Sequence, residues 1–186
     1  MKGKYVYLII LLLGVALDLG TKEAAFHYAE PGVCTTDGCI RVVDFSWFQL
    51  NWNKVENSGG MFGVGQGSGL LLRYFRLLAF VVVMIFFVTA KPTQRLFLTA
   101  LTLIGAGAVG NLYDSFFNAG KVRDFIEVHI PVLPWRTFNP WPNFNVADSL
   151  ILIGAGFLVL VLFKDAEFGN RKSPSEDTAE AVKESA

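Results

Sequence analysis

Two aspartates in this sequence could act together in acid–base chemistry. Asp124 follows a Val-Arg dipeptide, and Asp148 follows an Asn-Val-Ala tripeptide. Two carboxyl groups that lie close together do not both ionise easily, so one keeps its proton. The ionised group can activate water while the protonated group donates to a carbonyl oxygen or a leaving amine. Such a pair hydrolyses peptide bonds without a metal ion or a cofactor.

Four apolar segments must position these aspartates. They cover residues 5–21, 70–90, 96–117 and 146–163, and a bilayer-spanning helix needs about 20 mostly apolar residues. Only 17% of the side chains are charged, against about 25% in soluble domains. The first segment resembles a signal peptide, but three further segments favour a retained helix. The predicted fold class is an all-α integral membrane protein with four transmembrane helices.

Basic residues indicate the orientation of these helices. Lys4, Lys91 and Lys164 lie beside helix ends that would share one side of the membrane, and the positive-inside rule assigns that side to the cytoplasm. Both termini are then cytoplasmic, and the outer loops cover residues 22–69 and 118–145. Because the third and fourth helices are consecutive, Asp124 and Asp148 can face the same cleft near the outer surface.

The two outer loops differ in composition. Residues 40–55 are dense in β-branched and aromatic side chains, which predicts short strands. Residues 118–145 interleave prolines with tryptophans, which suits a path along the membrane surface. On this interpretation Asp124, taken alone, could be a turn residue.

Further polar side chains gather at the outer ends of the helices, where each needs a partner or a function. Asp18 and Lys22 are four residues apart and fit an ion pair on one helical face. Asn145 could cap the fourth helix, with Asp148 as the acid of its first turn. The remaining candidates are Asn57, Gly59, Asn111 and Asp114.

Small residues inside the spans favour a structural interpretation. Residues 105–110 fit a dinucleotide-binding glycine pattern, but that pattern needs a preceding strand. Inside a membrane helix such residues instead permit close helix packing. Gly154 and Gly156 receive the same interpretation.

Four other side chains also have structural interpretations. Arg73 and Arg76 fit snorkelling to lipid headgroups, with a contact to the substrate as the alternative. Cys34 and Cys39 could form a local disulfide or remain free thiols. The two histidines of the chain lack the spacing of zinc ligands, so no metal site is expected.

The charge distribution separates a membrane domain from a tail. Sixteen basic and sixteen acidic residues balance, which argues against a nucleic-acid binder. Six of the acids fall within residues 165–186. That segment has few large apolar side chains, so we expect a disordered cytoplasmic tail after a membrane domain at residues 1–164.

Taken together, the polar segments resemble those of bacterial lipoprotein signal peptidase (signal peptidase II). No single segment is specific, whereas five in order across four spans are highly specific. The matching segments are Asp18–Lys22, Asn57–Gly63, Gly110–Asp114, Gly120–Phe125 and Phe144–Ser149.

The resemblance implies an aspartyl endopeptidase of the bacterial plasma membrane. That family removes the signal peptide from diacylglyceryl-modified prolipoproteins, cutting just before the lipidated cysteine, near the extracytoplasmic face. It also implies a small outer β-cradle and a mobile helical flap near residues 61–68. We expect a monomer whose partners are these substrates and membrane lipids, with no cofactor and no nucleic acid.

The resemblance also implies roles for individual residues. Asp124 and Asp148 match the catalytic pair. The other matches are Asn111 and Asn145 as supporting asparagines, Asn57 and Gly59 as an outer-loop motif near the substrate, and Asp18 and Lys22 as a first-helix motif.

The sequence departs from the family pattern at several positions. Leu19 and the Gly60-Met61 pair replace the usual residues, and Ser115 stands where the family has arginine. We expect one of three arginines, Arg123, Arg136 or Arg73, to supply the missing charge. Two alternatives remain: a non-catalytic relative that binds lipidated peptides, and a small transporter lined by Asp18, Asp114 and Asp148.

Overall fold

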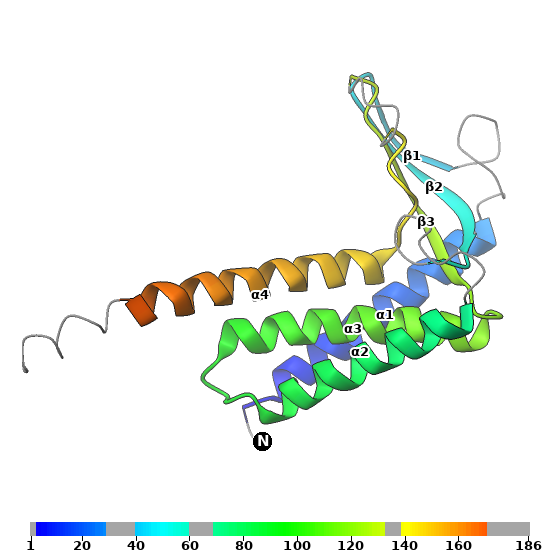
Figure 1. The fold of residues 1–186 in the computed structure, drawn as a ribbon. Coiled ribbons are helices and arrows are strands. Elements are labelled where there is room, and N and C mark those ends of the chain that lie inside the picture. The colour runs from blue at the N-terminus through cyan, green and yellow to red at the C-terminus, as the bar shows by residue number, and fades with distance from the viewer. Residues whose placement is uncertain (1–2, 29–39, 60–68, 133–138, 171–186) are drawn as a thin grey trace, which may run out of the picture.

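Membrane-length helices and a small sheet make up most of the described part of the chain (Figure 1). The computed structural model describes residues 3–28, 40–59, 69–132 and 139–170. Within this part of the chain the helices are α1 (Tyr5–Tyr28), α2 (Gly69–Thr89), α3 (Arg95–Phe117) and α4 (Val146–Asn170). The strands are β1 (Ile40–Phe45), β2 (Phe48–Asn57) and β3 (Val122–His129).

All four described helices are long and apolar enough to cross a membrane, as the sequence predicted. α1 continues to Tyr28 rather than ending near residue 21, because its last turns still pack on the bundle through the buried Lys22 and Ala25. α4 continues to Asn170, past the expected start of the tail. Residues 171–186, Cys34, Cys39 and the flap expected near residues 61–68 lie outside the described residues.

Helix α3 is the centre of the bundle. It contacts α1, α2 and α4, and 61% of its membrane-length window is buried, against 6–11% in the other helices. A Cβ atom on Gly107 would collide with the carbonyl oxygen of Ala147 in α4, and one on Gly110 would collide with Asp18 in α1. These small residues let the helices approach closely, which confirms the packing interpretation for this pattern.

Gly154 and Gly156 in α4 have different surroundings. A Cβ on Gly154 would lie 2.8 Å from the carbonyl oxygen of Ala100 in α3, so this glycine is also a packing residue. Nothing lies within 4 Å of a Cβ on Gly156. The packing interpretation is therefore confirmed for Gly154 and wrong for Gly156.

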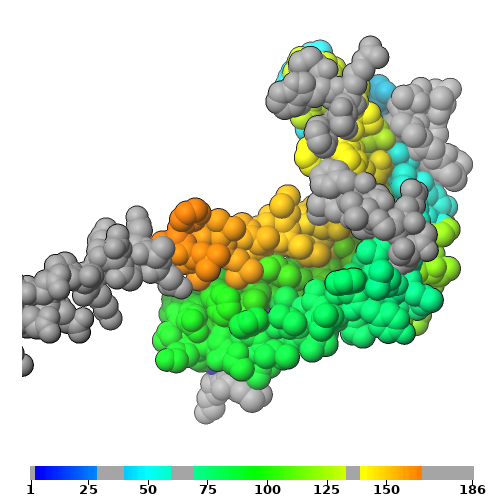
Figure 2. All heavy atoms as spheres, viewed as in Figure 1, coloured from blue at the N-terminus to red at the C-terminus, as the bar shows by residue number. Residues whose placement is uncertain are grey.

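A three-stranded antiparallel sheet projects from one end of the bundle, where α1 and α3 end and α2 and α4 begin (Figures 1 and 2). β1 and β2 lie where short strands were predicted. β3 was not predicted: Asp124 lies within a strand, opposite Val55 of β2, rather than in a surface turn. Strand pairing satisfies the backbone N–H and C=O groups of β3. The predicted fold class "all-α" omits this strand, which carries Asp124.

We expect Gly107→Ala to destabilise the protein by about 1–3 kcal/mol, because the added methyl group must push α4 away from α3. Gly156→Ala is the matched control, since its methyl group meets open space. Unfolding of both variants in mixed detergent micelles measures the difference. Equal stability of the two variants would contradict the close contact at Gly107.

Candidate active site

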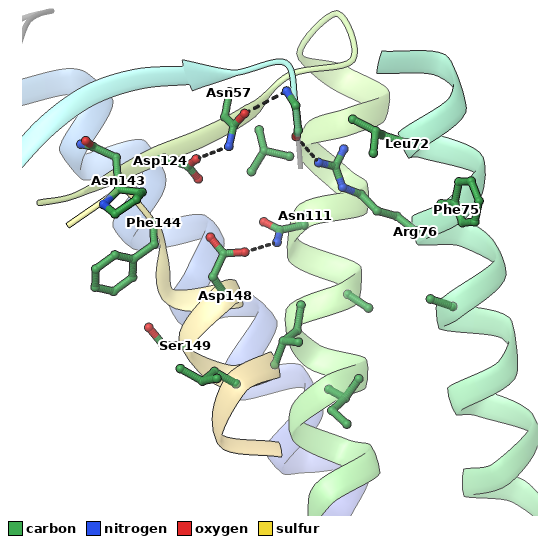
Figure 3. Close-up of a pocket in the computed structure, with 18 of the residues that line it drawn as sticks. Asn57, Leu72, Phe75, Arg76, Asn111, Asp124, Asn143, Phe144, Asp148 and Ser149 are labelled. Atoms are coloured by element: carbon green, nitrogen blue, oxygen red, sulfur yellow. Dashed lines mark hydrogen bonds between the residues drawn. The ribbon is translucent and has the colours of Figure 1, made fainter. Parts of the chain in front are cut away.

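A cavity of about 780 Å³ lies at the sheet end of the bundle, between α2, α3 and α4 (Figure 3). Its walls are mostly apolar, with contributions from Leu72, Ala79, Val83, Ile104 and Leu152. Polar groups gather on one part of its lining. They include Asn57, Gly59, Arg76, Asn111, Asp124 and Asp148, with Asn143 and Ser149 also on the lining.

Asp124 enters this cavity from β3. Its side chain is 2% exposed, and each carboxylate oxygen accepts a hydrogen bond from an asparagine amide. Asn57 Nδ2 donates to Oδ2 at 2.9 Å, and Asn145 Nδ2 donates to Oδ1 at 2.8 Å. A register shift in the β2–β3 pairing between Trp52 and Val55 lies beside this position. Amide donors orient the carboxyl group without adding charge to the site.

Asp148 enters the cavity from the first turn of α4. Its backbone N–H donates to Asn145 Oδ1 at 2.9 Å, and its Oδ2 accepts from the Asn145 backbone N–H at 3.2 Å. This reciprocal pair is a capping box, which satisfies helix N-terminal donors and fixes the rotamer of the acid. Asn111 Nδ2 donates to Asp148 Oδ1 at 2.8 Å. The N-cap interpretation of Asn145 is therefore confirmed.

Asn145 connects the two aspartates, because its side chain binds Asp124 and its backbone binds Asp148. Burial, followed by the negative charge of Asp148, raises the pKa of Asp124 to about 7. A carboxyl group in this state is about half protonated at neutral pH. The geometry therefore supports a pair that shares one proton.

A buried ion cluster lies behind this pair. Lys22 Nζ is 2.8 Å from Asp18 Oδ2 and 3.1 Å from Asp114 Oδ2, and all three side chains are 0% exposed. Lys22 also donates to Asn111 Oδ1 at 3.0 Å. Asp18 Oδ1 accepts the backbone N–H of Ala147 at 2.8 Å. The predicted ion pair is thus present, and it connects α1 to α3 and to the start of α4.

Asp114, another of the polar candidates from the sequence, is not among the residues that line the cavity. Its carboxylate accepts hydrogen bonds from the backbone N–H of Arg123 at 2.9 Å and from Arg123 Nε at 3.0 Å, in addition to its contact with Lys22. These bonds fix the start of β3 against the end of α3. In the described part of the chain, no group of three or more His, Cys, Asp or Glu side chains could hold a metal ion.

The arginines are arranged differently from the expectation. Arg123 binds Asp114, Arg73 lies over the ring of Phe116, and Arg136 lies outside the described residues. Arg76 instead donates to Ser115 Oγ at 2.8 Å. The snorkelling interpretation of Arg76 is therefore wrong, because its guanidinium turns inward to hydroxyl and carbonyl acceptors. Hydropathy could not reveal this, since it does not show which way a side chain on α2 points.

Comparison with known proteins identifies the family. A family model described as "Signal peptidase (SPase) II" matches residues 10–164. The chain belongs to the signal peptidase II family.

Relatives named "Lipoprotein signal peptidase" match the chain over most of its length. The protein from Halalkalibacterium halodurans is 34% identical over 176 residues, covering 94% of this chain and 99% of the relative. The protein from Thermodesulfovibrio yellowstonii is 36% identical over 160 residues, covering 84% and 92%. The relative from Clostridium novyi is 30% identical over 159 residues, covering 86% and 98%.

A solved structure shares the fold of this signal peptidase II family member. A bacterial membrane enzyme solved by the in meso method at 2.3 Å resolution superposes with a TM-score of 0.71. The two chains are 24% identical, and the match covers 87% of this chain and 89% of the other.

We expect Lys22→Met to destabilise the protein by about 3–5 kcal/mol, because it leaves the buried carboxylate of Asp18 without a cation and that of Asp114 with Arg123 alone. Lys121→Met is the control, since the Lys121–Glu56 pair is 43% and 42% exposed, and such surface pairs contribute about 0–1 kcal/mol. Unfolding in mixed micelles compares the two variants. Similar losses for both would show that the buried cluster does not stabilise the fold.

Proposed function

We propose that this protein removes the signal peptide from diacylglyceryl-modified prolipoproteins, cutting before the lipidated cysteine with Asp124 and Asp148 as the catalytic pair. One observation carries the proposal. Two carboxyl groups from separate elements, β3 and α4, line one largely apolar cavity between membrane-length helices. Apolar walls suit acyl chains and a signal-peptide helix, while the carboxyl pair supplies the chemistry for hydrolysis.

The hydrogen bonds favour different roles for the two aspartates. Asp148 sits at the N-terminus of α4, where the helix dipole favours a negative charge, and it accepts bonds from Asn111 and Asn145. Asp124, with its pKa raised to about 7, keeps the proton. Asp148 is therefore the base and Asp124 the acid of the proposed mechanism.

The reaction needs only these two groups and one water molecule. Asp148 accepts a proton from water as the hydroxide oxygen attacks the scissile carbonyl carbon, and Asp124 donates its proton to the carbonyl oxygen. The resulting diol collapses as the protonated Asp148 gives its proton to the leaving amine and a hydroxyl proton returns to Asp124. Both aspartates then regain their starting protonation states.

The proposed orientation has both termini in the cytoplasm and the sheet outside the plasma membrane. The basic end of the bundle supports this assignment. Lys4 Nζ donates to the carbonyl oxygens of Phe87 and Val88 at 2.6 and 2.9 Å, so it lies beside the α2–α3 turn that carries Lys91 and Arg95. The positive-inside rule assigns such an end to the cytoplasm. The cavity is then near the extracytoplasmic face, where lipidated substrates arrive.

We expect Asp124→Asn and Asp148→Asn each to lower kcat at least about 10³-fold, because an amide can neither take nor give the proton. Purified variants in micelles are incubated with a diacylated prolipoprotein and the cleaved product is measured. Asp44→Asn is the control, since Asp44 is exposed and pairs with Arg41 on β1. Efficient cleavage by either catalytic variant would refute the assignment, and a wild-type protein that binds but does not cut would favour the non-catalytic alternative.

Activity is expected to fall as the pH rises through about 7. The raised pKa of Asp124 means that its proton is held up to that pH and lost above it. The pair then carries two negative charges and has no acid, so kcat/KM drops about tenfold per pH unit on the alkaline side. Initial rates across about pH 5 to 9 measure this limb. Samples returned from alkaline to neutral pH control for denaturation, and a flat alkaline limb would contradict the shared proton.

A further inference from the structure

Arg76 places a positive charge on the cavity wall that the acid–base mechanism does not use. It lies near the start of α2, on a face formed with Leu72, Phe75, Ala79 and Val83. Residues at this spacing share one side of a helix. The rest of this face is apolar, and a charge inside a membrane protein is costly unless it has partners or a function.

The partners of Arg76 are neutral. Its Nη1 donates to Ser115 Oγ at 2.8 Å, and its Nη2 donates to the carbonyl oxygen of Gly59 at 3.0 Å. None of the ion pairs formed among the described residues includes Arg76. A guanidinium has five N–H donors, and these two bonds use two of them. The group is therefore held in place with its charge and several donors still available to a ligand.

Both acceptors of Arg76 belong to the network that positions the catalytic pair, and Figure 3 shows the path that leads from Arg76 through Asn57 to Asp124. Gly59 donates its N–H to Asn57 Oδ1 at 2.8 Å, and the Asn57 amide donates to one catalytic carboxylate. Ser115 Oγ donates to the carbonyl oxygen of Asn111 at 2.8 Å, and the Asn111 amide donates to the other. The distance from the guanidinium to the reacting centre is thus fixed through two short paths.

The electrostatics of the cavity select the kind of group that Arg76 can bind. The negative charge of Asp148 acts on Arg76, so an anionic ligand would meet repulsion from the same cavity. A neutral carbonyl oxygen avoids this repulsion and still gains a charge-assisted hydrogen bond. The proposed substrate carries such oxygens in its peptide backbone and in its two acyl esters.

We propose that Arg76 binds a carbonyl oxygen of the lipidated peptide, away from the scissile bond, and so positions the substrate for cleavage. This inference rests on the proposed function. The small side chain of Ser115 leaves room for the guanidinium and accepts its hydrogen bond. Arg76 on α2 thus supplies the positive charge that an arginine in place of Ser115 on α3 would carry.

The test is a kinetic comparison of Arg76 variants on a diacylated prolipoprotein peptide. We expect Arg76→Ala to raise KM about 10- to 100-fold, the effect of losing a charged hydrogen bond to substrate, with kcat changed by less than about threefold. Arg76→Lys should fall between wild type and alanine, because lysine keeps the charge and loses the planar fork. Arg73→Ala is the matched control, since Arg73 packs over Phe116 one turn earlier and does not line the cavity.

A dialkyl ether analogue of the substrate distinguishes the two sources of the carbonyl. If Arg76 binds an ester, Arg76→Ala will have no effect on the analogue, which lacks the carbonyl oxygens of the esters. If it binds the peptide backbone, the KM increase will be the same for both substrates. Either result supports the inference.

Two outcomes would overturn it. An unchanged KM in Arg76→Ala would exclude substrate binding, and a lower kcat at unchanged KM would show that Arg76 only supports the hydrogen-bond network. The catalytic assignment is judged separately by the asparagine variants. If Asp124→Asn and Asp148→Asn are inactive while Arg76→Ala has the kinetics of the wild type, this inference is wrong. The proposed function then still stands.

Discussion

The site depends on the burial of one ammonium group. Lys22 Nζ has no exposed surface and lies between Asp18 and Asp114, and a charge at that depth is tolerated only when it is paired. Each partner then makes a second connection: Asp18 accepts a backbone N–H at the start of α4, and Asp114 binds Arg123 at the start of β3. The elements that carry the two proposed catalytic aspartates are therefore fixed to the same cluster.

The chemistry of the site follows from the neutrality of the groups nearest the aspartates. Asn57, Asn111 and Asn145 supply hydrogen bonds that hold each carboxyl group in position. They carry no charge, so they do not cancel the repulsion between the two carboxylates as a nearby lysine would. Burial, followed by the negative charge of Asp148, raises the pKa of Asp124 to about 7, although the hydrogen bonds from Asn57 and Asn145 act to lower it. The positive charges are separated from the aspartates by a residue or by the cavity. Lys22 donates a hydrogen bond to Asn111, and Arg76 lies across the cavity.

Local sequence signals predicted the features that depend on neighbouring residues. The four spans follow from the length of their apolar runs, the Asp18–Lys22 pair from a four-residue spacing, and the capping role of Asn145 from its place before α4. β3 was missed because a strand is recognised largely by its partner, and that partner is distant in sequence. Asn57 pairs with Val122, with α2 and α3 lying between them.

The sequence by itself determined that the chain spans a membrane, which family it resembles, and which two carboxyl groups are candidates for catalysis. The tertiary structure decided which side chains share the cavity: Arg76 faces inward, and Asp114 is directed to the ion cluster. The physical reason is that a membrane helix has no polar face to mark its orientation, since lipid and protein interior are both apolar. Its rotation is set by close packing at residues such as Gly107 and Gly110, and by the buried polar groups that must find one another.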